Sequence, residues 1–445
     1  MQTCMHKEPK ADLMEGRIKA EWDTLRKVIV HRPGIEAFLG LLDPTASLYE
    51  RPFNLSAAQK EHDSLVDALK NGFGVGVETL EECIKAQAGR NGRVKSMIVD
   101  AALKSISFSG DKKEAKTALK NLKENADEYG MDYFINIMAL MPKVSIRKAK
   151  GAGAMRISVT ENNPLANLYF MRDQQAVTDK GVFISRMSKP QRRREPILTK
   201  MLWDAMGLPI AHETRAPGTF EGGDFMPMGD FALIGLGDRT NRHGAEQMLR
   251  YGQSFHEVAV VQQPSHPLIP GNDSDPMIDM HLDTYCNIAG SDTIIGSELL
   301  LKRARVEVYK KEGSSYKKEK ANTNLHGYLK FKDFGIINIS TVEQMSYSSN
   351  FLCIKDHSIL AIDSRLTAKM VLGRLSEKAK SDPKRYGALL SHAKKEYLKL
   401  ASSGLMFPNR KDMYDNGIDF STLDLSNITG GYGGAHCMTA AIERR

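Results

Sequence analysis

The chain has 445 residues, of which 41% are hydrophobic and 26% are charged. This balance is typical of a folded globular protein of two or three domains and excludes a largely disordered chain. The sequence has no run of about 18 apolar residues, so it predicts no transmembrane helix and no membrane partner. The first 20 residues lack the apolar core of a secretion signal, and we therefore expect a cytoplasmic protein.

The net charge of +8 raises the question of nucleic-acid binding, because basic residues gather at 192–194 and 302–320. A nucleic-acid-binding surface usually interleaves aromatic residues or carries a known module, and neither is clear here. We interpret 302–320 as a solvated strand–turn–strand surface and expect no nucleic-acid partner. The sequence leaves open whether the chain forms a homo-oligomer.

The chain contains five cysteines, and they lie far apart, without a CxxC pair or a metal-like cluster: Cys4, Cys83, Cys286, Cys353 and Cys437. This spacing argues against a disulfide framework in a chain of this size. Most of these residues are expected to be small core side chains, and at most one or two should be chemically special.

The first elements predict an α/β protein. A strand at 28–30 ends at a Pro-Gly turn, a polar helix covers about 56–70, and a strand interrupted by glycine follows at 75–77. Strands that alternate with helices in this way are typical of an α/β core.

Residues from about 85 to 150 have a different character. Apolar side chains recur at spacings of four, three, four and three on one helical face: Ala115, Leu119, Leu122, Ala126 and Tyr129. Lysine and glutamate fill the opposite face, and Pro142 and the small residues of 148–154 mark the end of the segment. We predict a helical domain at 85–155 inserted into an α/β core made of 1–84 and 156–445.

After residue 160 a loose repeat appears. Four segments begin at Asp173, Asp224, Asp283 and Ser348, and each has an apolar stretch, a polar turn and a second apolar strand. They recur at intervals of about 50 to 65 residues, a range typical of repeat architectures. With the strand at 28–30, the pattern predicts five similar units that close around an axis. Equivalent ends of the units would then meet at one central site.

Three units open on short acidic motifs, and a glycine-rich motif with a cysteine lies near the C-terminus: Met171-Arg172-Asp173, Glu221-Gly222-Gly223-Asp224, His281-Leu282-Asp283-Thr284 and Gly433-Gly434-Ala435-His436-Cys437-Met438. Each is weak alone. An aspartate at a strand start is commonly a turn or cap residue, and a lone cysteine is commonly a buried filler. His281 could be a core histidine with a local partner. The glycines at 430–434 form no phosphate-binding loop, because no Gly-Lys-Ser/Thr follows them.

Together and in this order, the motifs resemble those of the arginine deiminases in the guanidine-modifying (pentein) superfamily. The resemblance covers nearly the whole chain, through VIVHRPG, the helical insertion, PLANLYFMRD, QRRRE, EGGDFMPMGD, GDRT, MHLDT and GGAHCMT. It implies a five-fold pseudo-symmetric α/β propeller with an inserted helical bundle. It also implies an enzyme that needs no cofactor and no metal.

The chemistry of such an enzyme calls for these residue types. A guanidinium is a resonance-stabilised cation, so attack on its carbon needs a strong nucleophile and a site lined by anions. The resemblance implies that the Cys437 thiolate is the nucleophile, favoured by the bound cation. It implies bidentate hydrogen bonds to the guanidinium from Asp173 and Asp283. Glu221 would hold another nitrogen and orient His281, which would protonate the departing ammonia and then activate the hydrolytic water.

The other end of the substrate would be bound by a second set of residues. The resemblance implies that Arg192 and Arg239 bind the α-carboxylate and that Asn167, Phe170 and Gly431 make further contacts. In one place the sequence departs from the family, because Tyr432 stands where members typically carry an arginine that contributes to carboxylate binding and loop closure. The early loop LYERPFN is also less acidic than the family pattern. These departures leave strict specificity for free arginine open.

The favoured interpretation is hydrolysis of free arginine to citrulline and ammonia through an S-alkylthiouronium intermediate, because agmatine lacks the carboxylate that Arg192 and Arg239 would bind. Three alternatives remain. The chain could be a deiminase of agmatine or of a modified or peptidyl arginine. It could transfer the amidino group to an amine, or it could be a non-catalytic binding protein on the same scaffold. The complete set of acids, histidine and cysteine argues against a pure binding protein.

Overall fold

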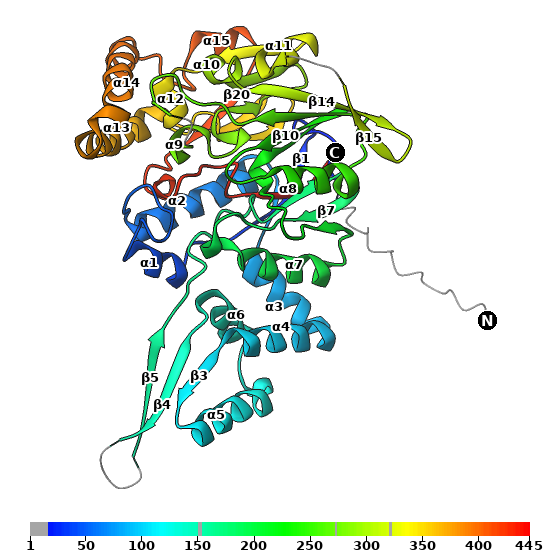
Figure 1. Cartoon of the computed structure of the whole chain (residues 1–445), viewed down its shortest axis with the longest axis vertical. Coiled ribbons are helices and arrows are strands. Elements are labelled where there is room, and N and C mark those ends of the chain that lie inside the picture. Colours follow the sequence, from blue (N-terminus) through cyan, green and yellow to red (C-terminus); the bar gives the residue numbers. More distant parts are fainter. Residues whose placement is uncertain (1–16, 150–153, 272–273, 320–322) are drawn as a thin grey trace, which may run out of the picture.

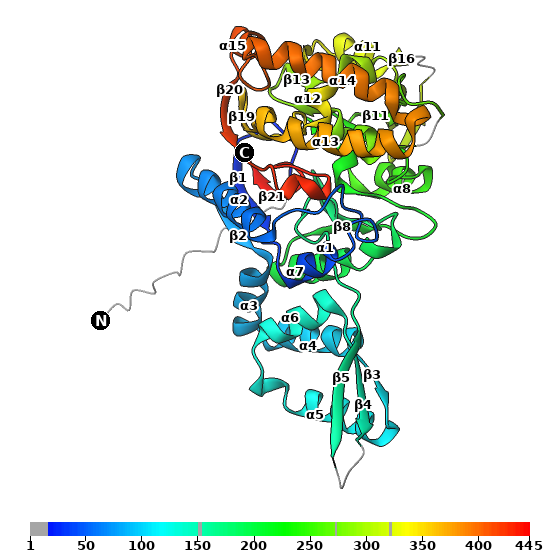
Figure 2. The same cartoon turned by 90° about the vertical axis from the view of Figure 1, so that its left-hand side faces the viewer.

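The computed structural model describes residues 17–149, 154–271, 274–319 and 323–445. Figures 1 and 2 show a large α/β body from which one segment, running from helix α3 to strand β5, projects at one end. Within the described residues, no helix is both long and apolar enough to cross a membrane.

The α/β body contains five sheets, four of three strands and one of six, that share one three-strand unit, in which a central strand has one antiparallel and one parallel neighbour. In the order antiparallel, central and parallel strand, they are β21 (Ala440–Arg444), β1 (Leu25–Val30) and β2 (Gly76–Thr79); β6 (Gln175–Thr178), β7 (Gly181–Ile184) and β8 (Ile210–Glu213); β9 (Phe225–Met228), β10 (Phe231–Leu236) and β11 (Glu257–Gln262); β12 (Cys286–Ile288), β13 (Thr293–Gly296) and β17 (Gly335–Asn338); and β18 (Leu352–Lys355), β19 (Ser358–Ile362) and β20 (Asp419–Leu423). The five units predicted from the repeat correspond to these five sheets.

Local chemistry accounts for the pairing. The antiparallel strands of four units follow each other directly and are joined by short turns, whereas β1 and β21 of the fifth unit come from opposite ends of the chain. At two of these turns Gly181 and Gly229 adopt positive φ angles of +121° and +75° that glycine tolerates without strain. A parallel neighbour needs a longer crossover, and helices supply it. The crossovers include α1 (Ile35–Leu41) and α2 (Leu55–Asp67), α7 (Glu195–Met206), α8 (Arg242–Gln247), α10 (Glu298–Leu301) and α11 (Leu325–Phe331), and α13 (Ser364–Ser381), α14 (Pro383–Ser403) and α15 (Lys411–Asp415).

The basic stretch at 302–320 lies at the edge of one of these sheets. Strand β14 (Arg305–Glu312) pairs with β11, turns at Gly313, and pairs with β15 (Ser315–Lys318); β16 (Thr323–Asn324) also pairs with β14. Most of its charged side chains are exposed. The predicted strand–turn–strand surface is therefore confirmed for its described part, which ends at residue 319.

The projecting segment contains the predicted helices but is not purely helical. Helices α3 (Leu80–Arg90), α4 (Gly92–Ser105), α5 (Lys112–Glu124) and α6 (Met131–Leu140) accompany a sheet of β3 (Ser107–Gly110), β4 (Lys143–Lys148) and β5 (Met155–Glu161). The expectation of an all-helical bundle is corrected in this respect. Its physical reason is the period-two alternation of apolar and polar residues in β4 and β5, with Val144 and Ile146 paired to Val159 and Ile157.

The apolar face predicted for 115–129 is only partly a helix face. Ala115, Leu119 and Leu122 lie on α5, whereas Ala126 begins a separate short 3₁₀ turn that ends before Tyr129. No residue of α5 is fully buried, and Leu119 is 40% exposed. The segment instead joins the main core through α3, α4 and α6, whose buried residues pack in the same hydrophobic cluster as those of α7.

Candidate active site

The five predicted catalytic residues all lie in short segments that precede the first strand of a unit: Asp173 before β6, Glu221 before β9, His281 and Asp283 before β12, and Cys437 before β21. The repeat therefore places them at equivalent positions in four units. The structure brings them together, and each is at most 3% exposed.

The sulfur of Cys437 lies between an acid and an amide. Its Sγ is 3.4 Å from Oδ2 of Asp283, and Nδ2 of Asn350 donates a hydrogen bond to Sγ at 3.1 Å. Burial, together with the negative charges of Asp283 and Asp173, raises the pKa of the Cys437 thiol well above its ordinary value. At neutral pH the sulfur therefore keeps its proton unless a cation binds nearby. The other described cysteines, Cys83, Cys286 and Cys353, are also free and buried, and Cys4 lies outside the described residues.

His281 lies between two acids. Its Nε2 is 3.0 Å from Oε2 of Glu221, and its Nδ1 is 3.8 Å from Oδ1 of Asp173. Burial lowers the pKa of His281, but the charges of Asp173, Asp224 and Glu221 outweigh burial and raise the pKa to about 9. The imidazole therefore carries a proton at neutral pH and can act as a general acid. Burial raises the pKa of Glu221, but Arg239 and His281 outweigh it, so that the net shift is downward and this acid stays ionised.

Asp283 is held on its other side by His436. The Nδ1 of His436 is 2.8 Å from Oδ2 of Asp283, while Nε2 is 3.9 Å from Oε1 of Glu21. Burial raises the pKa of Asp283, but His436 outweighs it and the net shift is downward. Oδ1 of Asp283 and Oδ1 of Asp173 are both buried and accept no hydrogen bond from a described residue. Two carboxylate oxygens of the site are thus free for a donor group of a ligand.

The two predicted carboxylate-binding arginines lie in the same site and contact acids. Nη1 of Arg192 is 2.7 Å from Oδ2 of Asp173, and its Nε and Nη2 donate to Glu195 at 3.0 and 2.9 Å. Nη1 of Arg239 is 3.6 Å from Oε2 of Glu221. Arg192 would therefore have to exchange Asp173 for a substrate carboxylate. Burial raises the pKa of Glu195 to about 7. Glu195 was not singled out from the sequence, although its position three residues after Arg192 at a helix start was a usable signal.

Aromatic rings and glycines form the wall beside the cysteine. A Cβ atom on Gly431 would lie 1.9 Å from the hydroxyl of Tyr169, and one on Gly433 would lie 2.4 Å from Cε1 of Phe170. Only glycine fits at these two positions, which places Phe170 and Gly431 against the Cys437 loop. Tyr432, between the glycines, has a φ of +73°, and its partly buried side chain packs against the main core.

Asn167 also lies beside this wall. Its side chain donates a hydrogen bond at 2.8 Å to the carbonyl oxygen of Ser47, in the loop that precedes Glu50. The same loop reaches the glycines through the backbone N–H of Glu50, which donates to the carbonyl oxygen of Gly430 at 2.8 Å.

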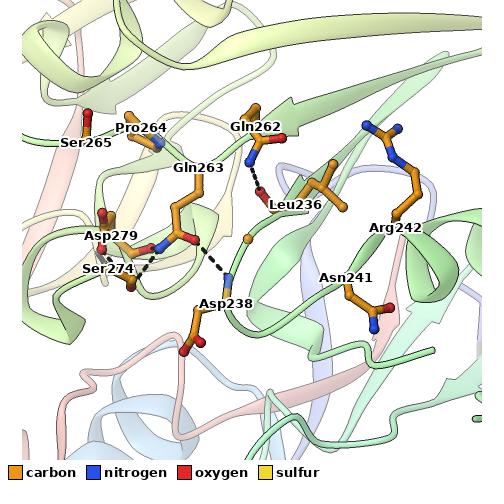
Figure 3. A pocket seen from close by; sticks show the side chains of 11 residues that line it. Leu236, Asp238, Asn241, Arg242, Gln262, Gln263, Pro264, Ser265, Ser274 and Asp279 are labelled. Atoms are coloured by element: carbon orange, nitrogen blue, oxygen red, sulfur yellow. Dashed lines mark hydrogen bonds between the residues drawn. The ribbon is translucent and has the colours of Figure 1, made fainter. Parts of the chain in front are cut away.

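An open cavity of about 720 Å³ is lined in part by Asp238 and Asn241, which flank Arg239 in the same loop (Figure 3). Gln263 crosses its wall: Oε1 accepts from the N–H of Asp238 at 2.8 Å, and Nε2 donates to Ser274 Oγ at 2.8 Å and to the carbonyl oxygen of Asp279 at 2.6 Å. The five predicted catalytic residues are not among those that line this cavity. Because they are buried, a ligand can reach them only if the surrounding loops move.

The ligand atoms of Asp173, Glu221 and His281 lie within 4.8 Å of one another, a spacing that could hold a metal ion. A histidine ligand must be neutral, however, and the pKa of His281 is raised to about 9 by its acidic neighbours despite its burial. A metal ion at this trio would therefore have to displace the proton of His281.

Comparison with known proteins fits this geometry. Residues 46–444 match the model of the arginine deiminase family. The chain belongs to the arginine deiminase family. It is 24% identical to an arginine deiminase of Halobacterium salinarum over 97% of both chains. It is also 24% identical to an arginine deiminase of Oenococcus oeni, over 80% of this chain and 89% of that protein.

Solved structures share the fold of this arginine deiminase family member. The N-terminal domain of ArgZ, an arginine dihydrolase from the cyanobacterial ornithine–ammonia cycle bound to its product, aligns with a TM-score of 0.51 and 11% identity over 95% of this chain and 98% of that chain. Unliganded AgrE aligns with a TM-score of 0.50 and 11% identity over 94% of this chain and 39% of that chain. At such low identity these matches show the α/β fold alone.

Proposed function

We propose that the chain hydrolyses the guanidinium of L-arginine to citrulline and ammonia through a covalent S-alkylthiouronium on Cys437. The observation that carries this proposal is the buried cluster of Cys437, Asp283, Asp173, Glu221 and His281, in which acids surround a thiol and a protonated histidine. Such a cluster suits a planar cation better than a neutral or anionic substrate.

In the first half of the reaction, the guanidinium would donate hydrogen bonds to the free Oδ1 atoms of Asp173 and Asp283. Its positive charge would offset the two acids that help to keep the thiol protonated, and Cys437 would lose its proton to solvent. Sulfur would then bond to the guanidinium carbon, and His281 would donate its proton to the nitrogen that leaves as ammonia.

In the second half, neutral His281 would take a proton from water as the oxygen bonds to the thiouronium carbon. The carbon–sulfur bond would then break with sulfur leaving as a thiolate, and the proton of the new hydroxyl would pass to the sulfur, which leaves neutral citrulline and the thiol. Glu221 would keep His281 oriented throughout, through the 3.0 Å contact with its Nε2. The net reaction consumes one water and releases one ammonia, and it requires no cofactor.

For the remainder of the substrate, we propose that Arg239 and Arg192 bind the α-carboxylate and that Asn167, Phe170 and Gly431 shape the channel. Both guanidinium groups lie within 4 Å of Glu221. Deimination of agmatine or of a modified or peptidyl arginine is the second candidate, because Tyr432 supplies no charge where family members typically carry an arginine.

The proposal includes the architecture that assembles the site. We propose that the five sheets close around a pseudo-five-fold axis and that 85–155 is an inserted domain between core segments 1–84 and 156–445. The shared strand pairing and the entry of site residues from the same end of four units support this arrangement.

The test is an assay of citrulline and ammonia with arginine, agmatine and arginine methyl ester, in the presence and absence of glycine as an acceptor amine. We expect turnover of arginine, weak turnover of the other two, and no diversion by glycine. Cys437→Ser should abolish turnover, whereas Cys353→Ser, at another buried free thiol, should retain it. Equal rates on agmatine, or citrulline production by Cys437→Ser, would contradict the proposal.

A further inference from the structure

Asn350 lies two residues before β18, in the unit that begins near Ser348 and contributes no acid to the site. This position is equivalent to those of Asp173 and Asp283 in their units, and Asn350 is only 3% exposed. The sequence repeat located this unit but gave no candidate in it, because an asparagine before a strand is usually a turn residue.

The orientation of the Asn350 amide is fixed by two backbone donors. Its Oδ1 accepts hydrogen bonds from the N–H of Gly434 at 2.8 Å and from the N–H of Cys437 at 3.1 Å. Because an N–H group can donate only to the oxygen of the amide, Nδ2 must face the other way. There it donates to Sγ of Cys437 at 3.1 Å and to the carbonyl oxygen of Asp283 at 3.4 Å.

The groups around the sulfur have opposite effects on its charge. Oδ2 of Asp283, at 3.4 Å, repels a thiolate, whereas a buried N–H donor at 3.1 Å stabilises one. In the proposed reaction the Cys437 sulfur is a thiolate twice, once before it attacks and once when the carbon–sulfur bond breaks. A donor that is already oriented stabilises this charge without reorganising.

We infer that Asn350 is a further catalytic residue, whose Nδ2 stabilises the Cys437 thiolate while its Oδ1 holds the loop that carries the cysteine. The thiol chemistry can be measured without turnover, although the role in catalysis rests on the proposed function. A purely structural role would need only the Oδ1 contacts, and this difference makes the two roles separable.

Two substitutions separate them. Asn350→Ala removes both functions, whereas Asn350→Asp keeps an oxygen for the two backbone donors and replaces the Nδ2 donor by a second oxygen. Ser349→Ala is the matched control, because Ser349 bonds the carbonyl oxygens of Asp283 and Thr284 and has no hydrogen bond to the sulfur. Melting curves and circular dichroism establish that each variant is folded.

The primary measurement is the pH dependence of alkylation by iodoacetamide, with mass spectrometry to follow the adduct on Cys437. We expect the midpoint to move to higher pH by at least about one unit in Asn350→Ala and Asn350→Asp, which is a tenfold loss of thiolate at a given pH. Ser349→Ala should match the wild type. With arginine as substrate, kcat should fall about 10- to 100-fold in both Asn350 variants, with a smaller change in KM.

The outcomes are distinguishable. Wild-type alkylation and turnover in Asn350→Asp would overturn the inference and leave Asn350 a structural residue. If Asn350→Ala fails to fold, unchanged alkylation in Asn350→Asp still overturns the inference, because a new acid beside the sulfur can only raise the thiol pKa further. If the wild type does not turn over arginine, the proposed function fails, but the alkylation profiles still test the effect of Asn350 on the sulfur.

Discussion

Cys437 and Asp283 lie 3.4 Å apart, and this acid adds to burial in raising the pKa of the Cys437 thiol. The acid keeps the thiol protonated until a cation arrives, so the substrate itself would trigger formation of its nucleophile. The thiol is thereby protected from uncharged electrophiles and oxidants that react with thiolates. The acid beside the thiol would then account both for the reactivity of the sulfur and for the selectivity for cations.

The first prediction at the residue scale concerns the charge on His281. Its acidic neighbours raise the pKa of His281 to about 9 despite burial. We therefore expect kcat/KM to fall as pH rises through about 9, because the proton donor is lost. The stabilisation from this raised pKa is complete below about 6.5, the ordinary value, and is lost between about 6.5 and 9.

Rate measurements and thermal melts from pH 6 to 10 check both effects. His281→Asn should reduce kcat by about 10²- to 10⁴-fold and should lose less stability than the wild type between pH 6.5 and 9. A wild-type rate that stays flat up to pH 10 would contradict the assignment.

A second prediction at this scale concerns Arg239. Arg239→Ala should reduce kcat/KM for arginine about 10- to 150-fold more than for agmatine, because a hydrogen bond to a charged group contributes about 1.5–3 kcal/mol and only arginine has a carboxylate. The arginine-to-agmatine ratio is the quantity to measure, because loss of a cation 3.6 Å from Glu221 affects both substrates. Arg239→Lys is the control, and an unchanged ratio in Arg239→Ala would count against carboxylate binding.

At the scale of elements, the site depends on loops fixed to one another. The backbone N–H of Glu50 donates to the carbonyl oxygen of Gly430, and the hydroxyl of Tyr347 donates to Glu50 at 2.6 Å. Gln263 ties the loop of Arg239 to the segment before His281 (Figure 3). These contacts join segments from different units, so a shift in one loop changes the geometry at the sulfur.

Gly431→Ala tests this dependence. The new Cβ would lie 1.9 Å from the hydroxyl of Tyr169 and 2.9 Å from Cε2 of Phe170, so the two rings must move. We expect the free energy of unfolding to fall by about 1–3 kcal/mol and kcat/KM to fall at least about tenfold. Urea denaturation and steady-state rates measure the two effects. Gly373→Ala is the control: it lies on an exposed face of α13 with nothing within 4 Å, so it should raise stability by up to about 1 kcal/mol and leave the rate unchanged.

In the whole molecule, segments near both ends of the described chain meet at the buried carboxylate of Glu21. Strand β21 pairs with β1, and Glu21 accepts a hydrogen bond from Arg172 at 2.8 Å and forms an ion pair with Arg444 at 2.9 Å. Burial raises the pKa of Glu21, but the two arginines outweigh it and hold the pKa well below its ordinary value. Figure 2 shows β1 and β21 side by side in the body. Through His436, this cluster also reaches Asp283 in the site.

Arg444→Met should therefore destabilise the whole chain. Removing one partner of a buried ion pair costs about 3–5 kcal/mol, and we expect the lower end because Arg172 remains. The folded-state pKa of Glu21 should rise, so the stability that ionised Glu21 provides above its unfolded-state pKa will be lost at a higher pH during acidification. Calorimetry between pH 2 and 7 measures both changes. Arg445→Met, at an exposed position that pairs with Glu443, should change stability by less than about 0.5 kcal/mol.

The sequence by itself indicated many of the strands through local signals, whereas the candidate site residues stood in motifs that were weak alone and were selected by the family resemblance. Alternating or continuous apolar stretches recur at the start of β6, β9, β12 and β18, and the acids, His281 and Cys437 stand immediately before strands. A helical pattern also indicated the projecting segment, but that prediction missed the strands β4 and β5, which have a period-two pattern.

Only the tertiary structure decided which distant groups share their charges and hydrogen bonds. The Asn350 side chain contacts Cys437, which lies 87 residues later in the sequence. The ion pairs of Glu21 with Arg172 and Arg444 also join distant segments. Arg192 lies in the QRRRE motif, but this motif did not reveal the contacts of Arg192 with Asp173 and Glu195. Local propensity and periodicity act within a few residues along the chain, whereas electrostatic and hydrogen-bond energies depend on distances through space that only packing of the five units sets.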